Sequence, residues 1–148
     1  MTAAVGVDLT ERTAALGPEL RPLADLLLGW LESGARSDHL FSDDVRVDLT
    51  VPHWRLQSRG TEAAFRLRAE QHPYAGSVRI ECLAATDRGF LMAFEERWAA
   101  DGQRWYCREM LHAVVADSRI AVLSVYCTGD WDEDLQRRYA ATVSVTAG

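Results

Sequence analysis

The sequence predicts an α+β fold in which helices precede a curved antiparallel sheet of about six strands. The main observation is the stretch from Phe90 to Asp130, where three long apolar runs are separated by two short turns. The first turn contains Asp101-Gly102, a pair that favours a two-residue hairpin because glycine accepts a positive φ. Asp117-Ser118 marks the second turn. A helical stripe of leucines before the strands indicates the α part of the fold.

Four helices are predicted from apolar residues at helical spacing and from end signals. Leucine and tryptophan form the apolar stripe of the first helix. Thr61 is expected to cap the third helix, which ends just before Pro73. Asp130 and Glu133 resemble a capping box at the start of the last helix. The helices are expected over residues 19–33, 38–41, 61–72 and 131–141.

Strands are predicted where β-branched and apolar residues run between turn residues. Before the three long strands they are expected at residues 45–51, 54–58 and 77–85. No repeat or low-complexity linker interrupts the chain of 148 residues, so all of it is predicted to form one domain. The core of this domain is expected at about 18–130, followed by the C-terminal helix at 131–141.

The two turns set an expected register for the long strands, because a hairpin turn of fixed length fixes the pairing of its strands. The expected pairs across the first turn are Trp98–Trp105, Glu96–Cys107 and Phe94–Glu109. Across the second turn they are Val115–Ile120, Leu111–Ser124, Glu109–Tyr126 and Cys107–Thr128. A bulge would exchange the two faces of a strand beyond it.

The register sorts the side chains into an inner and an outer face. Glu96 and Glu109 share the inner face with Phe, Trp and Tyr, and no strand residue there is basic. A carboxylate in apolar surroundings is costly unless it is hydrogen-bonded, protonated or reactive, so this face is predicted to line a pocket. The alternative is that both side chains simply bind Tyr, Trp or water. The outer face is predicted to mix apolar with basic side chains. The apolar ones are Leu123, Val125 and Met110, and the basic ones are Arg97, Arg108 and His112.

Composition and charge argue against several classes of binding partner for this chain. The formal net charge of −6 argues against a nucleic-acid or an anionic membrane surface. The N-terminus resembles no signal peptide, so a cytoplasmic location is expected. Three cysteines, an odd number, are expected to be reduced, and Cys107 and Cys127 are predicted to lie on opposite faces without a disulfide. No metal or cofactor is expected, since no ligand spacing indicates one.

Three stretches support a resemblance to a known family. They are LFSDDVRVDLTVP at 40–52, RGTEAAF at 59–65 and SRIAVLSVY at 118–126, within an order of helices, a strand pair, a helix and a meander. This order resembles the nuclear transport factor 2-like superfamily, whose cone-shaped fold includes ketosteroid isomerases, SnoaL-type polyketide cyclases, scytalone dehydratase and limonene epoxide hydrolase. The resemblance implies a cone closed by N-terminal helices and a homodimer through the convex sheet face.

The resemblance also bears on individual residues. Glu109 stands where ketosteroid isomerases hold the acid that binds the oxyanion, while Leu49 stands at the position of their catalytic base. The expected chemistry is therefore acid–base chemistry other than steroid isomerisation.

Four residues are candidates for catalysis. Glu109 is the expected acid, and a second carboxyl group, that of Glu96, would separate the two pKa values into one acid and one base. Tyr126 is expected to orient Glu109 or bind an oxyanion, unless it is an ordinary buried tyrosine. His53, after Pro52, is either a proton shuttle or an exposed loop histidine. The expected substrate-binding residues, some of which serve equally as core, are Trp98, Trp105, Phe94, Trp54, Trp30, Cys107 and Thr128.

These residues favour a cofactor-independent acid–base enzyme, of the isomerase, cyclase, dehydratase or elimination type. Its substrate would be a small, largely apolar carbonyl or polyketide-like metabolite of secondary metabolism. The alternative is a non-catalytic ligand-binding or dimerisation module with the same fold. Two buried carboxyl groups that converge on an open cavity would favour the enzyme, and a cone filled by Trp and Phe would favour the module.

Overall fold

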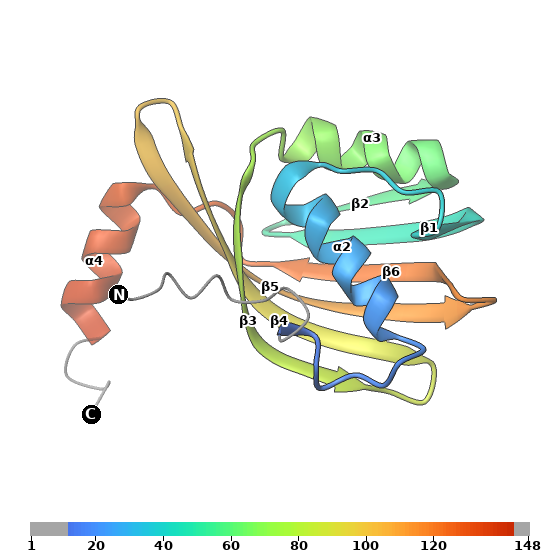
Figure 1. Ribbon diagram of the computed structural model, residues 1–148. Helices are drawn as coiled ribbons and strands as arrows, with labels where there is room; N and C mark the ends of the chain where they lie inside the picture. The colour runs from blue at the N-terminus through green and yellow to red at the C-terminus, as the bar shows by residue number, and fades with distance from the viewer. Residues whose placement is uncertain (1–11, 144–148) are drawn as a thin grey trace, which may run out of the picture.

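The computed structural model describes residues 12–143 and consists of one strongly curved sheet with helices on both of its faces (Figure 1). The strand order is β2-β1-β6-β5-β4-β3. The strands are β1 Phe41–Val51, β2 Trp54–Arg59, β3 Gly76–Ala85, β4 Gly89–Ala100, β5 Gln103–Ala116 and β6 Arg119–Cys127. The helices are α2 Arg21–Ser33, α3 Thr61–Gln71 and α4 Glu133–Val143.

The predicted α+β fold is confirmed, with one difference in the sheet. β1 runs parallel to β6, so the sheet is mixed, whereas all its other neighbouring pairs are antiparallel. The short helix predicted at 38–41 is wrong, because residues 38–40 form a turn and Phe41 already begins β1. Thr61 does not cap α3 but donates a hydrogen bond of 2.9 Å to the carbonyl of Ser42, which fastens the helix to β1.

The register predicted for the first hairpin is confirmed. Trp98 pairs with Trp105, and the other two expected pairs are also present. Asp101 and Gly102 have φ values of 54° and 74°, as a tight two-residue hairpin turn requires. Glu96 and Glu109 therefore point to the same face of the sheet, as expected.

The second hairpin begins as predicted and then departs from the prediction. Val115 pairs with Ile120, but Val114 pairs with Val122, so Ala121 is an extra residue that forms a β-bulge. Beyond it the predicted pairs are wrong, and the bulge is the physical reason. Glu109 pairs with Cys127 instead of Tyr126, Leu111 pairs with Val125 instead of Ser124, and Thr128 exchanges hydrogen bonds with Arg108 instead of lying opposite Cys107.

The bulge exchanges the inner and outer residues of β6. Leu123 and Val125, predicted on the outer face, are buried at 1% and 9% exposure. Tyr126, predicted beside Glu109, is 58% exposed on the outer face. Cys127 now points inward, on the same side as Cys107, which contradicts the prediction that the two thiols lie on opposite faces.

The core lies between the inner face of the sheet and helices α2 and α3. Figure 1 shows α2 crossing this face while α3 lies beside it over β1 and β2. The rings of Trp30, Phe41 and Phe65 join the two helices to β1, with centroids 5.3 to 6.0 Å apart. Burial of these rings and of the α2 leucines supplies the main driving force for the closure of the cone.

Helix α4 packs against the opposite, outer face. Trp131, just before it, exchanges backbone hydrogen bonds of 2.7 and 3.1 Å with Tyr106 of β5. The capping residue is Asp132, whose Oδ1 accepts a hydrogen bond of 2.9 Å from the N–H of Leu135. The predicted cap, Asp130, is therefore wrong, and its side chain belongs to another part of the structure.

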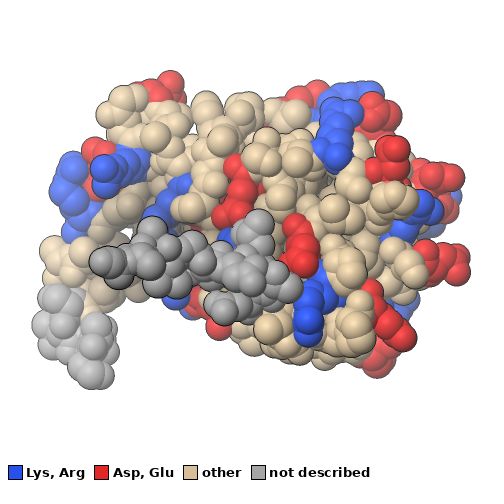
Figure 2. Space-filling model, viewed as in Figure 1, with Lys and Arg blue, Asp and Glu red and all other residues tan. Residues whose placement is uncertain are grey.

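The surface carries charges of both signs. Figure 2 shows acidic and basic side chains interspersed on the face in view, with no continuous basic area. This pattern fits the formal net charge of −6. Within residues 12–143 no helix has the length and apolar character needed to cross a membrane.

Candidate active site

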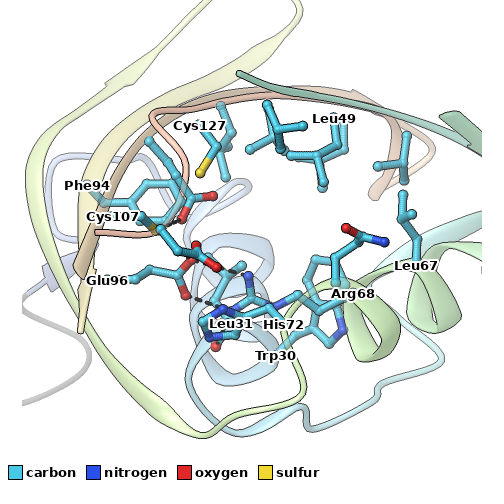
Figure 3. Close-up of a pocket in the computed structure, with 18 of the residues that line it drawn as sticks. Trp30, Leu31, Leu49, Leu67, Arg68, His72, Phe94, Glu96, Cys107 and Cys127 are labelled. Atoms are coloured by element: carbon cyan, nitrogen blue, oxygen red, sulfur yellow. Dashed lines mark hydrogen bonds and ion pairs between the residues drawn. The ribbon is translucent and has the colours of Figure 1, made fainter. Parts of the chain in front are cut away.

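A cavity of about 270 Å³ lies between α2, α3 and the inner face of the sheet (Figure 3). Its walls are mostly apolar, and Glu96, Arg68 and His72 lie together on one side of it (Figure 3). The apolar lining comprises Trp30, Leu31, Val47, Leu49, Val51, Ala64, Leu67, Phe94, Leu111, Leu123 and Val125. The polar and sulfur-containing lining comprises Arg68, Gln71, His72, Glu96, Cys107, Glu109, Cys127 and Asp130.

Glu109 is the central buried acid of this cavity. It projects from the middle of β5, is only 7% exposed, and is paired across the sheet with Phe94. The thiol of Cys107 donates a hydrogen bond of 3.1 Å to its Oε1. Burial, and then the hydrogen bond and negative charge of Glu96, hold the pKa of Glu109 well above its usual value. The neutral, protonated acid is therefore the favoured form.

Glu96 is equally buried but is held in the opposite protonation state. Arg68 of α3 donates two hydrogen bonds to its carboxylate, at 2.6 and 3.2 Å (Figure 3). Burial alone would raise the pKa of Glu96, but the hydrogen bonds from Glu109 and Arg68 and the charge of Arg68 lower it overall. The two carboxyl groups thus form an acid and its ionised partner, which is the division of roles that a pair of carboxyls adopts in a dry site.

Two cysteines flank Glu109. Cys107 is 2% exposed, and a hydrogen bond to Cys127 followed by burial raises the pKa of its thiol. The same hydrogen bond, accepted by Cys127, lowers the pKa of the Cys127 thiol. Cys127 is the last residue of β6 and, because of the bulge at Ala121, occupies the place that was predicted for Tyr126.

Asp130 lines the open side of the cavity. Asp130 as a whole is exposed, but its carboxyl group is partly buried. This burial is the larger cause, and the negative charge of Glu96 the smaller one, of a raised Asp130 pKa. Gly129 before Asp130 has φ of +83° and lies against Pro52, so the chain turns sharply here. Asp130 is therefore a third carboxyl group in the lining, near enough to Glu96 for that charge to act on it.

His72 closes the cavity near Arg68. Its ring stands edge-on to Trp98, with centroids 4.4 Å apart. Burial, and then the positive charge of Arg68, lower the pKa of His72 to about 4. The imidazole is consequently neutral at physiological pH and does not act there as a cation.

Five of the predicted site residues meet at the cavity, namely Glu109, Glu96, Phe94, Trp30 and Cys107. The other six do not line it. Tyr126 is turned outward by the bulge, and His53 and Trp54 are exposed at the turn between β1 and β2, where His53 has φ of 67°. Trp98 packs on His72, the indole of Trp105 donates to the carbonyl of Ala100, and Thr128 bonds the backbone of Arg108.

Arg68, Cys127, Asp130 and His72 were not predicted to belong to the site. The place of Arg68 could have been predicted from the sequence. It follows Ala64 and Phe65 at helical spacing, which puts its charge on the buried side of α3. Asp130 had no such signal, since an acid before a helix is also an ordinary cap.

Solved structures with the same fold provide a comparison. An NTF2-like protein from Anabaena variabilis is 15% identical, with a TM-score of 0.62 over 88% of this chain and 96% of that chain. An LEH-like epoxide hydrolase from M. tuberculosis is also 15% identical, with a TM-score of 0.60 over 88% and 97%. A proposed ketosteroid isomerase from Kribbella flavida is 18% identical, with a TM-score of 0.51 over 76% and 80%.

These likenesses extend over most of each chain, whereas the sequence identities are low. No protein-family model matches the sequence, and no curated protein matches it either. The structural likeness over most of each chain nevertheless confirms the resemblance noted in the sequence. The chain has the nuclear transport factor 2-like fold.

Proposed function

We propose that this chain is a cofactor-independent acid–base enzyme acting on a small, largely apolar carbonyl or polyketide-like metabolite of secondary metabolism. The reaction is an isomerisation, cyclisation, dehydration or elimination. The observation that carries the proposal is the pairing of a protonated Glu109 with an ionised Glu96 at one end of an aliphatic cavity. Separated pKa values in a pair of buried carboxyls are typical of acid–base sites.

Each carboxyl group has a distinct role in this proposal. Glu109 donates its proton, or a strong hydrogen bond, to the carbonyl oxygen or leaving group of the substrate. Glu96 remains ionised on Arg68 and accepts the hydrogen bond of Glu109 in the empty site, and the Glu109 O–H passes to the substrate oxygen when a substrate binds. Asp130, on the open side, removes a proton from carbon, and its raised pKa strengthens it as a base. The proton taken by Asp130 and the one given by Glu109 balance over a turnover.

The cavity walls set the substrate class. Valine and leucine side chains from β1, β5 and β6 supply more than half of the apolar lining residues, and they favour an apolar body. All the ionisable side chains of the lining lie together, which favours a substrate with one reactive polar group. Two of the structural neighbours are an LEH-like epoxide hydrolase and a proposed ketosteroid isomerase, and both names denote reactions on small molecules, which supports this assignment.

The proposal includes a homodimer formed through the outer face. Met110 and Tyr126 pair across β5 and β6 on this face and are 46% and 58% exposed. Arg108, next to Met110, is held by Glu81, so the patch has an apolar centre and a charged edge. A two-fold axis would place this patch on its own copy. The free cysteines fit a reducing compartment such as the cytoplasm.

The test is exchange of carbon-bound hydrogen, because proton removal next to a carbonyl is common to the reactions proposed. The protein is incubated in D₂O with a panel of small cyclic ketones and β-diketones, and deuterium uptake is measured by mass spectrometry. Wild type should accelerate uptake for at least one ketone. Glu109→Gln should reduce the rate by about 10²–10⁴-fold, the usual contribution of a general acid or base.

Glu95→Gln is the matched control. Glu95 is also buried and adjoins Glu96, but it faces outward and binds Arg79 and Tyr106. Its replacement should leave exchange unchanged. If ketones bind without any exchange, the alternative holds and the chain is a ligand-binding module. If Glu109→Gln exchanges at the wild-type rate, the assignment of the acid is wrong.

A further inference from the structure

We propose that Cys107, Glu109 and Cys127 form a binding site for a soft divalent cation such as Zn²⁺, with a fourth coordination position that opens to the cavity. This inference goes beyond the acid–base function, which needs no metal ion. It rests on the arrangement of three donor atoms on one wall of the cavity and on the charges around them.

The donor atoms are already gathered. The two sulfur atoms and a carboxylate oxygen of Glu109 all lie within 4.8 Å of one another, and the Cys107 sulfur is 3.1 Å from that carboxyl group. Zinc bonds of about 2.3 Å to sulfur and about 2.0 Å to oxygen place tetrahedral ligands roughly 3.5–3.8 Å apart. The three side chains therefore need only small rotations to coordinate one ion.

The backbone explains why these three donors converge. Cys107 and Glu109 are alternate residues of β5 and share its inner face, and Cys127 is the direct partner of Glu109 on β6. The bulge at Ala121 is what turns Cys127 inward. The ligands thus belong to two paired strands of the sheet and are preorganised by its hydrogen bonds, rather than by a mobile loop.

The donor types select the ion. Two thiolates and one carboxylate favour Zn²⁺, Cd²⁺ or Co²⁺ over Mg²⁺ or Ca²⁺, which prefer oxygen ligands. All three residues line the cavity, so its free volume lies beside the fourth position. Three protein ligands with one open position are the arrangement that a solvent molecule or a substrate oxygen completes.

The surrounding charges suit a cation. Glu96 is a negative neighbour of both thiols, and Asp130 is a negative neighbour of Cys127. Arg68 is the basic side chain in the cavity lining, and its charge is matched by the two hydrogen bonds to Glu96. The donors must lose their protons to bind, so binding releases protons to solvent. A bound ion and the Glu109 proton exclude each other, so the ion would suppress the proposed acid catalysis.

Co²⁺ titration of the reduced protein tests the site without any substrate. Thiolate ligands give Co²⁺ an intense near-ultraviolet charge-transfer band, and tetrahedral geometry gives strong visible bands. One equivalent should bind, and Zn²⁺ should remove both sets of bands. Cys107→Ser and Cys127→Ser should each weaken Co²⁺ binding by more than about tenfold, since losing even an outer partner of a metal ligand costs about 10–100-fold. Cys82→Ser is the control, because Cys82 is free and exposed on β3.

Folding of each variant is checked by circular dichroism and by its melting temperature without metal. In wild type and Cys82→Ser, Zn²⁺ should raise the melting temperature, and this measurement does not depend on the serine variants being stable. Absence of the charge-transfer band, or a band that only Cys82→Ser removes, would overturn the proposal. Ketone exchange at the wild-type rate in Glu109→Gln would overturn the acid assignment but would not bear on metal binding, so the two proposals fail separately.

Discussion

Arg68 of α3 and Glu96 of β4 form a buried ion pair that joins the helical layer to the sheet. Their side chains are only 15% and 4% exposed, and two hydrogen bonds connect them. Arg68 also donates to the carbonyl of Leu31, so α2 is included in the same junction. The ion pair therefore closes the cone and, at the same time, keeps the shared proton on Glu109.

Removing Arg68 should destabilise the protein strongly, because it leaves a buried carboxylate without its cation. We expect Arg68→Met to lower the free energy of unfolding by about 3–5 kcal/mol in urea denaturation. Arg36→Met is the matched control, since Arg36 pairs with Glu62 on the surface, and it should cost less than about 1 kcal/mol. Adding Glu96→Gln to Arg68→Met should recover part of the loss. Equal losses at the two arginines would contradict a buried ion pair.

The raised pKa of Glu109 gives stability a definite pH dependence. The group is protonated in the folded chain above the pKa of about 4.3 that it has when unfolded. Its contribution is full below about pH 4.3 and declines as pH rises toward the raised folded pKa, by at most about 1.4 kcal/mol per pH unit. The stability of wild type minus that of Glu109→Gln should therefore fall with rising pH.

Glu95 provides a control of opposite sign for this titration. Burial would raise the pKa of Glu95, but hydrogen bonds from Tyr106 and Arg79 lower it overall. Its contribution is present above the unfolded pKa and is lost as pH falls. The difference between wild type and Glu95→Gln should consequently rise with pH through the acid range. A common sign for both variants would show that Glu109 is not the neutral member of the pair.

His72 should make the fold sensitive to mild acid. Its pKa is about 6.5 in the unfolded chain and about 4 in the folded one, so the unfolded state binds the proton first. The stability that its neutral ring contributes is present above pH 6.5 and is lost as pH falls toward 4. His72→Gln should flatten this part of the urea-derived pH profile. His39→Gln, at an exposed turn, should leave it unchanged, and any flattening there would argue against His72 as the source.

Asp130 and Asp132 lie two residues apart, but replacing Asp130 should lower activity, whereas replacing Asp132 should lower stability. Asp130→Asn removes the proposed base and should slow ketone exchange by about 10²–10⁴-fold with little change in melting temperature. Asp132→Ala removes the α4 cap and should lower stability by about 1 kcal/mol while exchange continues. Parallel rate and melting measurements on both variants decide the matter. Wild-type exchange in Asp130→Asn would leave the base unassigned.

The proposed dimer can be tested at its apolar centre. A two-fold axis brings this patch of one subunit against the same patch of the other. Met110→Arg would therefore place like charges from both subunits close together, and it should convert a dimer into monomers at micromolar concentration. Light scattering coupled to size exclusion measures the mass. Tyr139→Arg is the control, because Tyr139 is also exposed but lies on α4. A monomeric wild type, or dissociation by the control alone, would contradict the outer-face interface.

Local turn chemistry predicted much of this structure. Asp101-Gly102 placed Glu96, Glu109, Phe94 and Cys107 on one face, and the structure confirms that placement. The same reasoning placed Tyr126 wrongly, because the sequence around Ala121 contains no glycine or other feature that marks a bulge. The partner of Glu96 was also not predicted. It comes from α3, and contacts between a helix and a distant strand depend on tertiary packing, which strand register does not describe.

The extra residue in β6 has a consequence for how such a cavity can change its specificity. If Ala121 were taken into the ladder opposite Val114, every later residue of β6 would shift by one position and turn to the other face. Val122, Ser124 and Tyr126 would then line the interior, while Leu123, Val125 and Cys127 would face outward. A change of strand pairing would thereby replace an aliphatic and thiol wall by a hydroxyl-bearing one, without any point substitution. Sequence changes that move or remove the bulge while Ala121 is kept are thus a short evolutionary route from one substrate chemistry to another.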